Sequence, residues 1–94
     1  MTEFGTISLP VLQLPPVING NSGTFTWTPG AGPIHYELDL GSTFGNTNLY
    51  KSGVINTTTT TVLSMPASGT KVYAQLFYEI DGTWKSTEYS YIEP

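Results

Sequence analysis

The sequence predicts an all-β domain in which two sheets pack as a sandwich, and three observations support this prediction. Of its 94 residues, 10 are glycine and 7 are proline, and these fall between short segments in which apolar and polar residues alternate. β-Branched and aromatic residues dominate the segments, as a pleated, half-buried surface requires. No window places apolar residues at helical spacing over three turns. Short strands at this spacing favour a two-sheet sandwich.

Residues 1–20 differ from the rest because prolines interrupt their apolar runs at Pro10 and at the Pro15-Pro16 pair. Proline has no N–H to donate to a ladder, so this segment is predicted to be an edge strand or an extended arm. Leu12 and Leu14 are the apolar side chains that we expect the arm to present. Either this domain covers them, or a neighbouring subunit accepts the arm as an added strand.

Residues 21–94 are predicted to form the sandwich itself. Six further segments have the composition of strands, namely 24–28, 34–40, 49–51, 58–64, 71–80 and 83–92. The last two are separated only by Asp81-Gly82, which is a strong signal for a type I′ turn. We therefore expect these two strands to pair antiparallel.

Two of the segments also predict which side chains face the interior, because successive residues of a strand point to opposite faces. In segment 34–40 the inward residues are predicted to be Ile34, Tyr36, Leu38 and Leu40. In segment 71–80 they are predicted to be Val72, Ala74, Leu76, Tyr78 and Ile80. The outward set then consists of His35, Glu37, Asp39, Tyr73, Gln75 and Phe77.

An ordered series of short motifs runs along residues 23–92. In chain order these are FTWTPG at 25–30, YELDLG at 36–41, LYKSG at 49–53, MP at 65–66 with Gly69, VYAQLF at 72–77 and DGTW at 81–84. With this series, the span resembles the fibronectin type III-like, or immunoglobulin-like, β-sandwich domains of bacterial or bacteriophage proteins. The resemblance implies a seven-stranded Greek-key sandwich with Trp27 in its core. It implies no enzymatic activity, since this fold serves mostly as a spacer, adhesion or docking module.

The chain carries few charges and is acidic, with 3 basic residues, 7 carboxylates, a net charge of −4 and a pI near 4.5. All the basic residues are lysines, and the absence of arginine argues against nucleic acid as a partner. No apolar run approaches the roughly 20 residues of a membrane span, so membrane insertion is not expected. The sequence begins at Met1 without a signal-peptide pattern, and we therefore expect a complete small protein.

Catalytic and metal-binding patterns are weak, so we expect no enzyme, no metal site and no cofactor. His35 is the only histidine and there is no cysteine, which leaves no set of imidazole and thiolate ligands. Glu37 and Asp39 lie two apart on one predicted strand, so their side chains share a face about 7 Å apart. That spacing is typical of a solvated sheet face, with paired carboxylates or calcium ligands as alternatives.

Aromatic residues gather in the last third of the chain, where 6 of the 12 lie within residues 73–91. Tyr73 and Phe77 are predicted to point outward, where an aromatic side chain is costly unless something covers it. Either the N-terminal segment or a loop covers these side chains, or a partner does. The candidate interaction residues are Tyr73, Phe77, Trp84 and Tyr89, together with Leu12 and Leu14 of the arm.

Two non-enzymatic functions are compatible with these features. The first is a structural protein of a larger assembly, expected to be a bacteriophage capsid or tail decoration protein on the virion surface. It would dock on protein subunits, or form a homo-oligomer, through its N-terminal arm and aromatic face. The alternative is a secreted carbohydrate-binding or adhesion module, extracellular or at the cell surface, in which Tyr73, Phe77 and Trp84 form a stacking platform for a polysaccharide.

Overall fold

The computed structural model describes residues 9–94, which contain seven strands in two antiparallel sheets. The strands are β1 (Val17–Asn19), β2 (Ser22–Thr26), β3 (His35–Gly41), β4 (Tyr50–Lys51), β5 (Thr59–Val62), β6 (Lys71–Ile80) and β7 (Thr83–Ile92). No helix occurs within residues 9–94, which confirms the all-β prediction.

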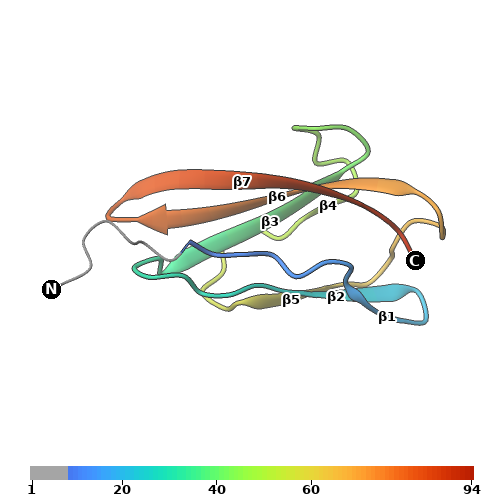
Figure 1. The fold of residues 1–94 in the computed structure, drawn as a ribbon, viewed down its shortest axis with the longest axis horizontal. Helices are drawn as coiled ribbons and strands as arrows, with labels where there is room; N and C mark the ends of the chain where they lie inside the picture. The colour runs from blue at the N-terminus through green and yellow to red at the C-terminus, as the bar shows by residue number, and fades with distance from the viewer. Residues whose placement is uncertain (1–8) are drawn as a thin grey trace, which may run out of the picture.

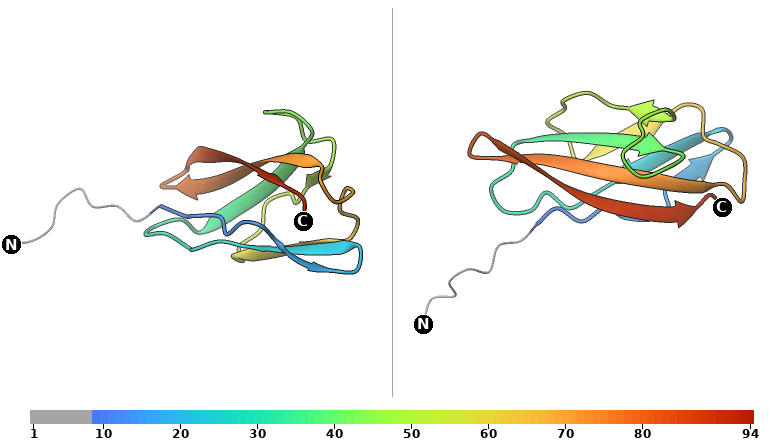
Figure 2. Two further views of the ribbon diagram at one scale, coloured as in Figure 1. Left: turned by 45° about the vertical axis from the view of Figure 1, so that its right-hand side comes forward. Right: turned by 90° about the horizontal axis from the view of Figure 1, so that it is seen from above.

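The two sheets form two facing layers (Figure 1). The three-stranded sheet has the order β1-β2-β5, and the four-stranded sheet has the order β4-β3-β6-β7. The second sheet is organised around the long hairpin of β6 and β7, which pair from Lys71 opposite Ile92 to Ile80 opposite Thr83. Figure 2 shows these two strands running side by side along the molecule.

The turn of this hairpin follows directly from its two residues. Asp81 has a φ of 52° and Gly82 a φ of 80°, so both lie in the left-handed region that a type I′ turn requires. Glycine reaches this region without strain, and aspartate is among the few other residues that tolerate it. The predicted turn and the antiparallel pairing of the last two strands are therefore confirmed.

One apolar core fills the space between the sheets. Its buried members are Leu12, Phe25, Trp27, Tyr36, Leu38, Leu40, Val62, Val72, Ala74, Leu76 and Tyr78. Trp27 packs against Tyr36 with ring centroids 5.9 Å apart. The Tyr36 hydroxyl donates to the carbonyl of Pro29 at 2.7 Å, which satisfies its polar end.

The predicted inward faces of the two longest alternating segments are confirmed, apart from their ends. Ile34 is 65% exposed, because β3 begins only at His35 and Ile34 precedes the strand. Ile80 is half-buried beside the hairpin turn. Burial therefore follows the alternation in the middle of each strand, where neighbouring strands flank it on both sides.

Residues 9–20 lie along the domain's own three-stranded sheet. The N–H of Gln13 donates to Thr26 at 2.9 Å, and the N–H of Thr28 donates to Val11 at 3.0 Å. Between these bonds Leu12 is 4% exposed and belongs to the core, while Leu14 packs half-buried against it. Regular pairing starts only at β1, after the last proline of the segment. Residues 1–8 of the expected arm lie outside the described residues.

Candidate functional site

The outward side chains of the four-stranded sheet lie in rows that cross the strands, and we call this surface the charged face. Cross-strand register places His35 beside Glu79, and Glu79 beside Trp84. The next row runs from Glu37 through Phe77 to Ser86, and the following row from Lys51 through Asp39 and Gln75 to Glu88. Polar, aromatic and charged side chains therefore alternate across neighbouring strands of one sheet.

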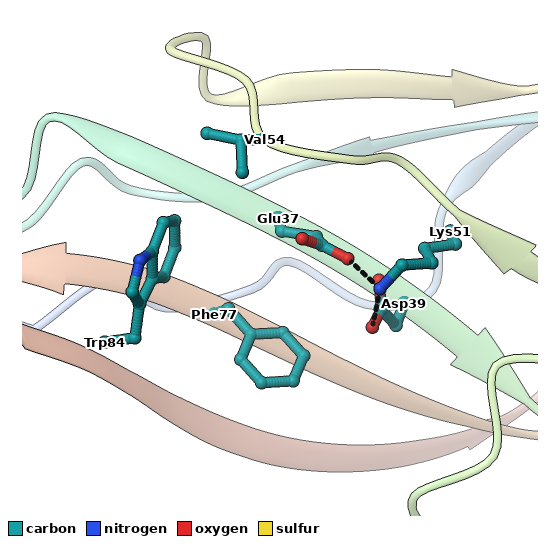
Figure 3. Close-up of a pocket in the computed structure, with 6 residues that line it drawn as sticks. All are labelled: Glu37, Asp39, Lys51, Val54, Phe77 and Trp84. Carbon is teal, nitrogen blue, oxygen red and sulfur yellow. Dashed lines mark hydrogen bonds and ion pairs between the residues drawn. The ribbon is translucent and has the colours of Figure 1, made fainter.

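A groove of about 350 Å³ crosses this face. Its lining residues are Glu37, Asp39, Lys51, Val54, Phe77 and Trp84. Figure 3 shows Trp84 and Lys51 at opposite ends, the two carboxyl groups and Phe77 between them, and Val54 on the loop beyond β3. The groove is thus aromatic at one end and ionic at the other.

Lys51 forms the ionic end together with the two carboxyl groups of β3. Its Nζ lies 2.6 Å from Glu37 Oε2 and 3.6 Å from Asp39 Oδ2. Lys51 stands directly opposite Asp39 because β4 pairs antiparallel with β3 at that register. The lysine side chain is 61% exposed, so this ion pair is open to solvent on the side of the ammonium group.

Asp39 does not lie on a solvated face, which corrects the sequence-based expectation. It is 4% exposed, and its Oδ1 atom is buried without a hydrogen-bond partner. Alternation places Asp39 outward, but β3 is an interior strand, and Lys51 and Gln75 on its two neighbours flank the carboxyl group. A buried carboxyl oxygen without a donor is costly for the folded protein.

The surroundings separate the proton affinities of the two carboxyl groups. Burial and the adjacent Glu37 carboxyl group raise the pKa of Asp39 from 3.8 to about 6. Burial also acts to raise the pKa of Glu37, but the adjacent Asp39 carboxyl group, the hydrogen bond from Lys51 and the lysine charge outweigh it, so that this pKa is lowered. Asp39 is therefore the carboxyl group of the groove that changes charge near neutral pH.

The aromatic end of the groove presents one exposed ring. Trp84 is 41% exposed, although it is among the largest apolar side chains of the protein. Phe77 is half-buried between Glu37 and Ser86 on the neighbouring strands. In the described part of the chain, no other aromatic side chain lines the groove beside these two.

The structure divides the predicted interaction residues into two groups. Phe77 and Trp84 line the groove, and Tyr73 lies on the same face further along β6. Tyr73 contacts Phe44 of the loop between β3 and β4, with ring centroids 4.5 Å apart. The Lys71 ammonium group lies 5.4 Å from the centroid of the Tyr73 ring.

The second group packs on the inner side of the sheet. Tyr89 is half-buried against the core, and its hydroxyl accepts the N–H of Leu12 at 3.2 Å. Leu14 packs against the same core. These residues connect the N-terminal segment to β7 within one domain.

Sequence reasoning missed two lining residues, Lys51 and Val54. Lys51 lies in a segment that was predicted to be a strand, but the residue opposite it depends on how β4 pairs with β3. Val54 follows β4 in a loop with no motif of its own, and it also borders a neighbouring hollow lined by His35 and Ile55. No pattern along the chain places these side chains beside Phe77 and Trp84.

The outward side chains of the three-stranded sheet form a second surface, which we call the uncharged face. They are Val17, Asn19, Ser22, Thr24, Thr26, Thr59 and Thr61. Segments 9–34 and 52–70, which supply this sheet and its flanks, contain no aspartate, glutamate, lysine, arginine or histidine. Every charged residue of the described chain belongs to the four-stranded sheet, its hairpin turn or the adjoining C-terminal segment.

Three findings concern metals, membranes and known proteins. Within residues 9–94, no three histidine, cysteine or acidic side chains cluster as metal ligands. The same part of the chain has no helix of the length and apolar character that crossing a bilayer requires. Comparison with protein-family models, curated proteins and solved structures finds no significant match to this chain.

Proposed function

We propose that this protein is a non-enzymatic binding module, extracellular or at the cell surface, that recognises a polysaccharide through the groove on its charged face. The observation that carries the proposal is the exposed indole of Trp84 facing along the sheet toward the Glu37 and Asp39 carboxyl groups. A sugar ring needs both elements, because one of its faces is apolar and its rim consists of hydroxyl groups.

The chemistry of each end supports this assignment. The apolar face of a sugar ring stacks on the Trp84 indole and contacts Phe77, which removes apolar surface from water. Its hydroxyls donate to the carboxyl groups of Glu37 and Asp39. The volume of about 350 Å³ is at the lower end for ligand sites, and an open groove lets a polymer continue beyond it.

The strand arrangement supports the assignment to fibronectin type III-like Greek-key sandwiches. The chain leaves the three-stranded sheet after β2, forms β3 and β4 in the other sheet, and returns for β5. As a result β3 pairs with β6, although β5 is closer to it along the chain. Such non-sequential pairing is what Greek-key connections produce. In such folds, function resides in a site on the surface and not in the scaffold.

The proposal is tested by titrating the protein with a panel of soluble oligosaccharides and following heat of binding and the Trp84 indole N–H resonance. We expect dissociation constants of about micromolar to millimolar for at least one oligosaccharide. Trp84→Ala should weaken that binding about thirtyfold, since aromatic hot spots contribute roughly 2 kcal/mol or more. Leu63→Ala, which removes another exposed apolar side chain 79% accessible to solvent, should leave binding unchanged.

Two results would contradict this function. If no oligosaccharide shifts the Trp84 resonance, or if Trp84→Ala and Leu63→Ala weaken binding alike, the groove is not a saccharide site. Melting temperatures of both variants should match the wild-type protein within a few degrees, because each side chain is well exposed.

A second candidate function, a decoration protein of a bacteriophage capsid or tail, is favoured by the uncharged face. The buried centres of protein interfaces are depleted in charged residues, and this face has none. Such a protein docks on subunits of the virion through one side and leaves the charged face in solvent. Within residues 1–20, Val17 belongs to this face and Val11 is exposed as well.

This candidate is tested by placing one charge on each face. Thr61→Lys should fold normally but lose occupancy on virus particles that lack the protein, whereas Ser86→Lys on the charged face should bind as the wild type does. Sedimentation of particles with bound protein and electron microscopy give the occupancy. Equal binding by wild-type protein and Thr61→Lys, or no binding by either, excludes docking through the uncharged face.

A further inference from the structure

The most unusual atom of the groove is Oδ1 of Asp39. It belongs to a side chain that is 4% exposed, it has no hydrogen-bond partner, and the residue lines the groove. Buried carboxyl oxygens in folded proteins nearly always accept a hydrogen bond. This arrangement is therefore missing a donor.

The existing donor of the groove is Lys51, and it serves the two carboxyl groups unequally. Its ammonium nitrogen lies 2.6 Å from Glu37 Oε2 but 3.6 Å from Asp39 Oδ2. The second distance is too long for a hydrogen bond. One ammonium group thus neutralises two carboxyl groups without satisfying both of them.

From this geometry we infer that the ligand is an amine-bearing saccharide, whose ammonium group takes the place between Glu37 and Asp39 that Lys51 Nζ now occupies. The inference rests on the proposed function, and it names the ligand class of the same site. The sugar ring lies toward Trp84 while its amine donates to both carboxyl groups, including the unpartnered Oδ1. Lys51 acts as a built-in competitor that holds the position until the ligand arrives.

Lys51 is suited to give way. Its side chain is 61% exposed, and it stands on β4, an edge strand of only two residues. An exposed ion pair is weak, and its ammonium group regains full hydration when it swings out. Glu37 and Asp39, by contrast, stay fixed on the interior strand β3. The carboxyl groups are the rigid half of the site, and the lysine is the movable half.

The charge of the lining favours an amine over other sugar substituents. The lining has two carboxyl groups and one ammonium group, so displacing Lys51 leaves a site with two negative charges. A uronic acid brings a third carboxylate and is repelled, whereas a neutral acetamide does not neutralise the pair. A protonated amine restores charge balance and supplies up to three donors.

The inference is tested with a matched pair of ligands, namely oligomers of glucosamine and the same oligomers with every amine acetylated. Calorimetry between mildly acidic and neutral pH should show that the wild-type protein prefers the free amine by about tenfold. Lys51→Gln should raise the affinity for the glucosamine oligomer about threefold to fivefold, because the competitor is gone. It should not raise the affinity for the acetylated oligomer.

Two control variants keep the result specific. Lys85→Gln removes an exposed lysine of β7 that does not line the groove, and it should leave both affinities unchanged. Glu37→Gln should abolish the preference for the free amine. Both variants should unfold within a few degrees of the wild-type protein, which shows that changes in affinity do not come from misfolding.

The outcomes separate the inference from the function on which it rests. Equal affinity for the two oligomers, or a loss of glucosamine affinity in Lys51→Gln, overturns the inference while the polysaccharide function stands. Failure of every saccharide to bind overturns both. A lysine-containing peptide that binds as tightly as the glucosamine oligomer also overturns it, because the groove then selects an ammonium group without regard to the sugar.

Discussion

The two outer faces of this protein arise from the same alternation of side chains but differ in chemistry. On the charged face, Asp39 is buried beside Glu37 and Lys51, and Trp84 is exposed at the other end of a groove. On the uncharged face, threonine hydroxyls such as those of Thr24 and Thr61 bond to each other at 3.1 Å. The charged face therefore includes a buried carboxyl oxygen without a hydrogen-bond partner, whereas the threonine hydroxyls of the uncharged face bond to each other.

This difference teaches where to look for function. A threonine-rich face is stable in water, and its hydroxyl groups do not need a ligand as a hydrogen-bond partner. A buried carboxyl group with an unpartnered oxygen lowers the stability of the isolated domain. Such groups are concentrated at binding sites, where a ligand supplies the missing hydrogen bond. Substitutions at matched positions of the two sheets test that contrast.

The largest effect is expected for Gly41→Ala at the end of β3. A methyl group built there would lie 1.9 Å from the carbonyl oxygen of Asn46, in the loop that folds back over this strand. Because the obstacle is backbone, the loop must move, and we expect a loss of about 3 kcal/mol in the free energy of unfolding. Urea denaturation followed by tryptophan fluorescence measures it.

The matched position in the three-stranded sheet is Gly23. A methyl group there would meet side chains only among its nearest neighbours, namely Met65 at 2.9 Å from Cγ and Ile18 at 3.3 Å from Cδ1, and the flexible methionine can turn away. Gly23→Ala should therefore cost less than about 1 kcal/mol. If Gly23→Ala lowered the free energy of unfolding as much as Gly41→Ala, the loop over the charged face would be no more rigid than the Met65 side chain.

The next effect concerns the pH dependence of Asp39→Asn. The pKa of Asp39 in the folded protein, about 6, lies above its ordinary value of 3.8, so the folded state holds the proton more tightly than the unfolded state. The resulting stabilisation is complete below about pH 4 and is lost as the pH rises through 6. Relative to Asp39→Asn, the wild-type protein should lose about 2 kcal/mol between these limits.

Glu37 contributes in the opposite sense, because its pKa is lowered, and its stabilisation disappears as the pH falls. Asp39→Asn retains Glu37 and Lys51, so the difference between the variant and the wild type isolates Asp39. Stability curves at several pH values provide the comparison. A difference that stays constant with pH would mean that Asp39 is not the group that changes charge.

A smaller effect is expected for Glu79→Gln on the charged face. Glu79 Oε1 lies 2.7 Å from His35 Nδ1, and both side chains are partly exposed. Such a pair contributes less than about 1 kcal/mol, and salt screens it at a pH where the imidazole is protonated. The variant should therefore differ from the wild type by less at high salt than at low salt, in thermal denaturation followed by circular dichroism.

The smallest effect is expected on the uncharged face, for the double change of Thr24 and Thr61 to valine. Valine retains the β-branched shape, and removing both hydroxyls together leaves neither of them without a partner. We expect a change of less than about 0.5 kcal/mol that does not vary with pH or salt. A larger loss would assign the uncharged face a structural role beyond that of a solvated surface.

Much of the fold was predictable because it depends on local rules. Alternation placed Leu38 and Leu76 in the core, and the Asp81-Gly82 pair positioned the turn of the longest hairpin. The aromatic residues Phe77 and Trp84 were recognised as candidates, because aromatic side chains on an outward face stand out against a polar background. Each of these inferences uses residues close together along the chain.

The composition of the site depended on the tertiary structure. Alternation directs Asp39 outward, but burial came from the strands on either side of β3, and the ammonium group beside it came from β4. Tyr73 and Tyr89 look alike in the sequence, yet one contacts Phe44 on the charged face and the other bonds Leu12 on the inner side. A side chain's direction follows from its own strand, but its neighbours follow from how distant strands are brought into register.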